Sequence, residues 1–137
     1  MLRTRILPGE RWWGGAAHEG AKMPFTAETE YTIDLFRECA GNQSVPFFLS
    51  TSGRYIWGES AFRITFSGGV ITADGDARLY EDLGTLRGAY RAAQAAHFPP
   101  SGSVPDLRFY RTPQYNTWSE LTYNQRQDAV TAYADAI

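Results

Sequence analysis

The sequence predicts a mainly β chain, in which an antiparallel β-sandwich is followed by a strand and a helix. The clearest strand is residues 62–66, where Phe62, Ile64 and Phe66 alternate with polar residues, as in a half-buried strand. Residues 67–69 contain two glycines, which supply the positive φ of a tight turn, and Val70–Ala73 leads back. These residues are therefore expected to form an antiparallel hairpin.

The same pattern recurs upstream, within a β-like region that runs from Arg3 to about Ala73. Residues 45–50 are a short apolar run rich in β-formers, Gly53 turns the chain, and Tyr55–Trp57 returns. Successive strands joined by tight turns are typical of an antiparallel sandwich.

A helix is expected after Gly84. Thr85 is its predicted N-cap, and Pro99-Pro100 ends it. Its apolar face consists of Leu86, Ala89, Tyr90, Ala93 and His97. Residues 101–106 have the composition of a linker, and residues 107–110 are expected to be the last strand of the first domain.

Residues 113–137 predict the beginning of a second body. Residues 113–121 are expected to be a buried strand, and an amphipathic helix follows. The apolar stripe of that helix is Ala129, Val130, Tyr133, Ala134 and Ile137. A strand with a crossover helix is half of a βαβ unit, and a parallel strand needs a neighbour. We therefore expect a sandwich domain over 1–111 and, over 112–137, the start of a truncated domain.

Composition excludes several kinds of partner. The 137-residue chain has a formal net charge of −2, and its basic residues are scattered, which argues against nucleic acid and anionic membranes. Aromatic residues make up 15% of the chain; they suit pleated surfaces and, where exposed, stacking on sugars. Because Cys39 is alone, neither an internal disulfide nor a cysteine-based zinc site is expected.

No metal ion or cofactor is expected. His18-Glu19 and His97 lack paired-histidine spacing, and residues 74–76 lack the acidic spacing of a calcium loop. No stretch approaches the ~18 apolar residues of a membrane-spanning helix. No signal-peptide pattern follows Met1, which predicts a cytoplasmic location by default, or a periplasmic one if a leader has been lost.

Two candidate sites lie in the first domain. Trp12 and Trp13 are consecutive on a predicted strand and point to opposite faces, so at most one belongs to the core. The other either packs at an interface or forms a platform for a sugar. Asn42 and Gln43 lie in a loop before an apolar strand, where they either cap the backbone or bond ligand hydroxyls.

A third candidate is the predicted strand in the second body. Asn116, Trp118 and Glu120 alternate on one side of it. Trp118 and Glu120 suit a carbohydrate pocket, because one stacks and the other accepts charge-assisted hydrogen bonds. The alternative is that they fill layers inside a barrel, although a glutamate buried there without a partner is costly.

Six segments in sequence order resemble the N-terminal part of one branch of glycoside hydrolase family 31, the retaining α-glycosidases. They are residues 10–15 (ERWWGG), 23–25 (MPF), 42–50 (NQSVPFFLS), 53–57 (GRYIW), 98–102 (FPPSG) and 113–121 (PQYNTWSEL). The resemblance covers about residues 6–137.

The resemblance implies a galactose-mutarotase-like β-sandwich followed by a (β/α)8 barrel that carries the active site. In the family, two aspartates on later barrel strands act as nucleophile and acid/base, roughly 5 Å apart, and cleave α-glycosides with retention. Neither aspartate is expected within residues 1–137, so the chain alone is expected to be inactive.

The resemblance also implies substrate-binding residues. In many relatives a sandwich loop offers an aspartate to the sugar, and Asn42 or Gln43 occupies that loop here. An amide bonds hydroxyls as well but adds no negative charge. Trp118, Glu120 and Tyr123 fall on and after the implied first barrel strand. Glu120 and Tyr123 are nearer its C-terminal end, where such barrels place their active sites.

Three functions follow from these patterns. The first is an N-terminal fragment of an α-glycoside hydrolase, which packs on the missing barrel domain and contributes one loop to an α-glycoside pocket. The second is a stand-alone carbohydrate-binding sandwich that uses Trp12, Trp13 or Trp57 as its platform. The third is a purely structural or oligomerising domain.

Overall fold

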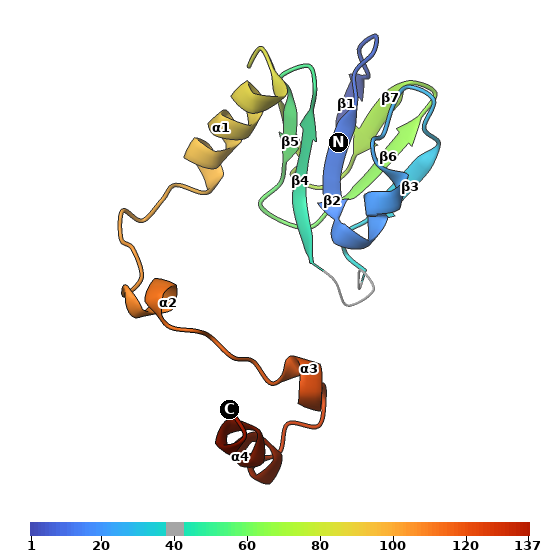
Figure 1. Ribbon diagram of the computed structural model, residues 1–137. Coiled ribbons are helices and arrows are strands. Elements are labelled where there is room, and N and C mark those ends of the chain that lie inside the picture. Colours follow the sequence, from blue (N-terminus) through green and yellow to red (C-terminus); the bar gives the residue numbers. More distant parts are fainter. Residues whose placement is uncertain (38–42) are drawn as a thin grey trace. The chain divides into compact units, whose positions relative to one another are not determined.

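The computed structural model describes residues 1–37 and 43–137 (Figure 1). The chain divides into two compact units, Met1–Pro100 and Ser101–Ile137, which are described separately below. The expected domain boundary between residues 111 and 112 stays a prediction.

Two antiparallel sheets make up most of the first unit. The first sheet has the strand order β1 (Leu2–Arg5), β7 (Val70–Ala73), β6 (Arg63–Ser67) and β3 (Tyr31–Asp34). The second has the order β2 (Trp12–Ala16), β4 (Ser44–Ser50), β5 (Tyr55–Trp57) and β8 (Arg78–Tyr80). The described chain is therefore mainly β, as expected for a β-sandwich.

The core contains side chains from both sheets and is rich in aromatic rings. Phe25 stacks on Phe66 with 4.6 Å between ring centroids, and Phe48 lies 6.1 Å from both Phe62 and Phe66. Phe62, Ile64 and Phe66 are fully buried, which confirms the alternation predicted for residues 62–66. Burial of these large rings supplies the main driving force for folding of this unit.

The predicted helix after Gly84 is α1 (Leu86–His97), and its N-cap is confirmed. The hydroxyl of Thr85 accepts a hydrogen bond from the backbone N–H of Gly88 at 3.1 Å. The helix ends before Pro99-Pro100. Ala89 and Ala93 are buried in a second cluster with side chains of β4, β5 and β8, so α1 covers part of the outer face of the second sheet (Figure 1).

The remaining helices are short. The first unit contains the 3-10 helix η1 (Ala17–Lys22), and the second contains α2 (Arg108–Arg111), α3 (Trp118–Leu121) and α4 (Gln127–Asp135). The helix predicted near the C-terminus is confirmed as α4. None of α2, α3 and α4 buries a side chain completely.

Two strands predicted from the sequence are wrong, because residues 107–110 and 113–121 contain α2 and α3 instead. A side chain satisfies the first backbone donor in both cases. The Oδ1 atom of Asp106 accepts from the N–H of Arg108 at 2.8 Å, and that of Asn116 accepts from the N–H of Trp118 at 3.1 Å. Among the described residues neither segment pairs with a strand, so local hydrogen bonds replace the sheet ladder.

The two units differ in burial, which predicts a difference in amide hydrogen exchange. Ile64 and Ile71 lie in the buried strands of the first unit, whereas no residue of α4 is buried. We expect their amides to exchange at least about a thousandfold more slowly than those of α4, because exchange from the core requires global unfolding. Exchange measured by NMR tests this, and equal protection of α4 in a monomer would contradict it.

Candidate functional site

A cavity of about 380 Å³ lies at the ends of β2 and β4, where the sequence places the Asn42–Gln43 loop. Asn42 lies outside the described residues, and Gln43 lines the cavity with Ser44. The other lining residues are small or apolar: Gly14, Gly15, Ala16, Ala17, Met23 and Val45. A largely apolar wall with an amide and a hydroxyl is typical of a small-molecule site.

Two glycines of β2 shape this cavity. The register between β2 and β4 shifts between Gly14 and Ala16, and Gly14 and Gly15 have φ values of +140° and +89°. A Cβ on Gly14 would lie 2.2 Å from the carbonyl oxygen of Phe47, and one on Gly15 would lie 2.6 Å from the ring of Phe48. The two strands therefore approach each other closely here, and only glycine permits that approach.

The helix η1 follows this irregularity and contacts the candidate loop. The backbone N–H of Ala17 donates to the carbonyl oxygen of Gln43 at 2.9 Å. Ala17 begins η1 and Met23 follows it, so both ends of η1 contribute to the cavity wall.

A buried carboxylate lies within η1. Glu19 is only 5% exposed, and both of its oxygens accept from the hydroxyl of Tyr31 at 3.0 Å. Its Oε1 lies 2.8 Å from Nε2 of His18, and its Oε2 lies 3.0 Å from Nζ of Lys22. Burial alone would raise the pKa of Glu19, but the hydrogen bonds from Lys22 and Tyr31 and the nearby positive charges hold it below its usual range.

A second buried carboxylate belongs to the ERWWGG segment. Glu10 forms an ion pair with Arg54 and also accepts from the hydroxyl of Ser50 at 2.7 Å and the N–H of Leu7 at 2.9 Å. Burial would raise the pKa of Glu10, but these bonds, that from Arg54 foremost, keep it below its usual value. Since these partners are internal, this buried group helps to stabilise the fold.

The tryptophans of the first unit divide as predicted, since Trp12 is 0% exposed and Trp13 is half-buried. Trp12 is therefore wrong as a candidate sugar platform. The ring of Trp57 stacks on that of His97 with 4.4 Å between centroids and 18° between planes. Because one face of Trp57 is already covered, Trp13 has the better access for a ligand.

The candidates of the second unit lie on and after α3, not on a strand. The rings of Trp118 and Tyr123 pack edge to face, with centroids 5.1 Å apart. Trp118 is 57% exposed and Tyr123 is 90% exposed, and Glu120 is exposed as well. The structure thus brings the two aromatic residues together, and their part in substrate binding stays a prediction.

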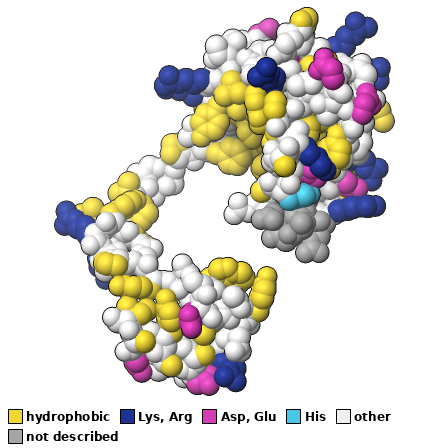
Figure 2. Space-filling model, turned by 45° about the vertical axis from the view of Figure 1, so that its right-hand side comes forward, with side chains coloured by type: hydrophobic (Ala, Val, Ile, Leu, Met, Phe, Trp, Pro, Cys, Tyr) yellow, Lys and Arg dark blue, Asp and Glu magenta, His cyan; other side chains and the backbone are white. Residues whose placement is uncertain are grey.

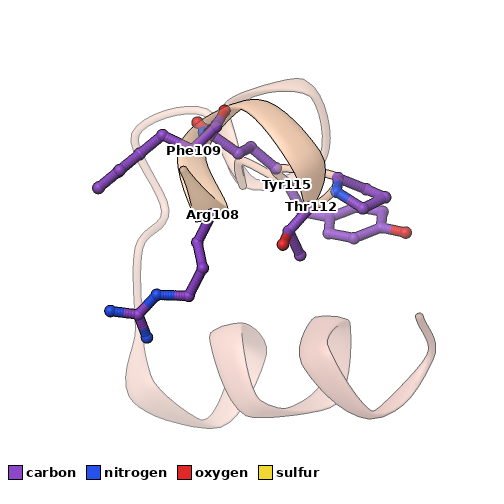
Figure 3. Close-up of a pocket in the computed structure, with 6 residues that line it drawn as sticks. Arg108, Phe109, Thr112 and Tyr115 are labelled. Carbon is purple, nitrogen blue, oxygen red and sulfur yellow. Dashed lines mark hydrogen bonds between the residues drawn. The ribbon is translucent and has the colours of Figure 1, made fainter. Parts of the chain in front are cut away.

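Another hollow, of about 530 Å³, lies in the second unit. Its lining residues are Arg108, Phe109, Thr112, Pro113, Gln114 and Tyr115. Figure 3 shows the Arg108 side chain extending away from Thr112 and Tyr115. All six lining residues are exposed, so this hollow lacks the enclosed polar groups of a ligand site.

Two further features are absent from residues 1–37 and 43–137, namely a metal-binding cluster and a membrane-spanning helix. This part of the chain has no group of three or more His, Cys, Asp or Glu side chains arranged to hold a metal ion. Over the same residues, no helix combines the length and the apolarity needed to cross a membrane.

In comparisons with known proteins, no family model and no curated protein matches the chain.

Gln43 is the residue of the cavity wall that the sequence singled out, and its role in substrate binding stays a prediction. Glu19 and its partners His18, Lys22 and Tyr31 form the Glu19 cluster. The only local signal for it in the sequence is the i,i+3 spacing of Glu19 and Lys22. Tyr31 joins that cluster from a different strand, which residue spacing does not reveal. The role of Gly14 and Gly15 depends on their contacts with β4, which residue spacing does not reveal either.

Proposed function

We propose that the chain is the N-terminal sandwich, with the segment that leads to the (β/α)8 barrel, of a retaining α-glycosidase related to glycoside hydrolase family 31. The observation that carries the proposal is the cavity beside Gln43. It lies where the family resemblance puts a substrate-contacting loop, and glycines that tolerate no side chain shape it.

In this proposal the chain binds and orients substrate, and the catalytic carboxylates lie in the barrel. The amide of Gln43 offers both donors and an acceptor to sugar hydroxyls, and it adds no charge. No charged side chain is among the residues described as lining the cavity. This composition suits an uncharged sugar. Asn42 belongs to the same proposed loop.

An apolar face that α1 covers only in part is an argument for a partner domain. Trp13, Phe47 and Leu49 lie on the outer face of the second sheet, and Tyr90 and Phe98 of the α1 region are about half exposed. Figure 2 shows apolar side chains gathered on the face of the sandwich from which the chain leaves. Apolar patches of this kind mark interfaces. We assign this face to the barrel domain.

The exposed pair Trp118 and Tyr123 is proposed to contact substrate from the barrel side, with Glu120 beside it. Aromatic rings stack on sugar faces, and a carboxylate accepts strong hydrogen bonds from hydroxyls. This role rests on the family resemblance together with the exposure of all three side chains.

The test is a kinetic comparison in the full gene product. Gln43→Ala is expected to raise KM for an α-glycoside by about fivefold to tenfold, because one neutral hydrogen bond contributes about 1 kcal/mol. Gln127→Ala, an exposed glutamine at the start of α4, is the matched control and should leave KM unchanged.

Two results would overturn the proposal. One is an unchanged KM in the Gln43→Ala variant. The other is saturable sugar binding by residues 1–137 alone, lost on Trp13→Ala, without α-glycoside hydrolysis by the full product. The second result would identify a stand-alone carbohydrate-binding module instead.

A further inference from the structure

The Glu19 cluster differs from an ordinary surface ion pair in its burial and in the number of its partners. Its carboxylate is buried in a helix of six residues, yet it has three different side-chain partners. Lys22 also bonds the hydroxyl of Tyr31 and lies 3.9 Å from the centre of its ring. Burying a charge is costly unless it is paired and hydrogen-bonded, so the geometry of this cluster is tightly defined.

The cluster joins η1 to the first sheet. His18, Glu19 and Lys22 belong to η1, whereas Tyr31 begins β3. Figure 1 shows η1, the blue coil after β2, beside β3. The short helix has no side-chain N-cap and buries only Glu19, so the bonds of Glu19 are its main attachment.

The backbone of η1 is bonded to the candidate site. Ala17 is two residues from Glu19, and its N–H donates to the carbonyl oxygen of Gln43. Ala17 and Met23 flank the cluster in sequence, and both line the cavity. A change in the position of η1 therefore moves one wall of the cavity and the backbone of Gln43 together.

We propose that Glu19 is a positioning residue, whose bonds to Tyr31 and Lys22 hold η1 so that Ala17 fixes the Gln43 backbone at the cavity. Glu19 touches no substrate in this proposal. The inference rests on the proposed function for the role of Gln43, but its structural part is measurable without a sugar.

The test uses Glu19→Gln and Tyr31→Phe in the 137-residue chain. Each is expected to speed hydrogen exchange at the Ala17 amide about tenfold or more and to shift the Gln43 and Ser44 amide resonances, since hydrogen bonds to charged groups are the strong ones. Because exchange from the core reports overall stability, the control at Ile64 and Ile71 is the position of their amide resonances, which should not shift. Glu28→Gln, an exposed carboxylate bonded to Thr26, is the control and should alter none of these signals.

A pH titration separates positioning from general stability. The pKa of Glu19 is held below its usual value, so the cluster is intact above about pH 4.3 and is lost as the pH falls through the lower folded-state value. The Ala17 amide shift should follow this titration in the parent chain and not in Glu19→Gln. His18, Lys22 and Tyr31 are the other titratable groups in contact, and all three are present in both proteins.

The outcomes distinguish this inference from the proposed function. Unchanged Ala17 exchange and unchanged Gln43 resonances in both variants would overturn the positioning role. Resonance shifts of similar size at Ile64 and Ile71 would also overturn it, because Glu19 would then support the whole fold. In Glu19→Gln, shifted Gln43 resonances with an unaltered KM in the full gene product would uphold the positioning role and contradict the substrate role of Gln43.

Discussion

Replacing Arg54 with methionine is expected to lower the free energy of unfolding by about 3–5 kcal/mol, because it leaves the carboxylate of Glu10 buried without its charge partner. The guanidinium makes five hydrogen bonds. Two go to Glu10, and the others go to the Thr4 hydroxyl at 3.2 Å, the Glu81 carboxylate at 2.9 Å and the Arg5 carbonyl at 2.8 Å. Arg54 thus connects the N-terminal strand, the segment before β2 and the residue after β8.

Urea denaturation followed by tryptophan fluorescence measures this effect. Arg91→Met, at an exposed position of α1, is the matched control and should change stability by less than about 0.5 kcal/mol. The double variant Glu10→Leu/Arg54→Met should be more stable than Arg54→Met, since no unpaired charge remains buried. An Arg54→Met chain as stable as Arg91→Met would contradict the structural role of the pair.

The same pair predicts a pH dependence with a defined sign. The pKa of Glu10 lies below its usual value in the folded chain, so its contribution to stability is complete above about pH 4.3 and is lost as the pH falls through the folded-state value. Without Arg54, burial instead favours the protonated acid. The stability difference between the parent chain and Arg54→Met should therefore be largest at neutral pH and shrink below about pH 4.3.

Gly14→Ala is the second substitution with a large expected effect, a loss of about 2–6 kcal/mol. The residue has φ +140°, and its Cβ would lie 2.2 Å from the Phe47 carbonyl oxygen and 2.7 Å from the Phe48 Cα. Both obstacles are backbone atoms of the paired strand β4, so no side-chain rotation relieves them. Strain at an unfavourable φ and overpacking each cost about 1–3 kcal/mol.

Two other glycines serve as controls for Gly14→Ala. A Cβ on Gly20 meets nothing within 4 Å, and Gly20 has no positive φ, so Gly20→Ala should be close to neutral. Gly9 also has open space but has φ +73°, so Gly9→Ala isolates the backbone strain and should cost about 1 kcal/mol. A Gly14→Ala chain that is as stable as Gly9→Ala would show that β2 and β4 do not approach as closely as described.

Features that depend on neighbouring residues could be predicted from the sequence. The hairpin of β6 and β7 follows from the alternation of Phe62, Ile64 and Phe66 and the glycine turn, and the start of α1 follows from Thr85. The burial of only one residue of the Trp12–Trp13 pair follows from strand geometry alone.

Features that depend on distant residues could not be predicted. Glu10 and Arg54 are 44 positions apart, and Glu19 and Tyr31 belong to different elements, so spacing gives no signal for either pair. In the second unit the error concerns local structure instead. Two of its segments were predicted to be strands, but Asp106 and Asn116 satisfy local N–H groups and the chain forms the short helices α2 and α3.

The stereochemistry of hydrolysis tests the proposed retaining α-glycosidase activity. The full gene product should be mixed with an α-glycoside, and the first sugar released should be observed by proton NMR before it mutarotates. We expect the α-anomer to appear first and residues 1–137 alone to release none. Release of the β-anomer first, or cleavage by residues 1–137 alone, would contradict it.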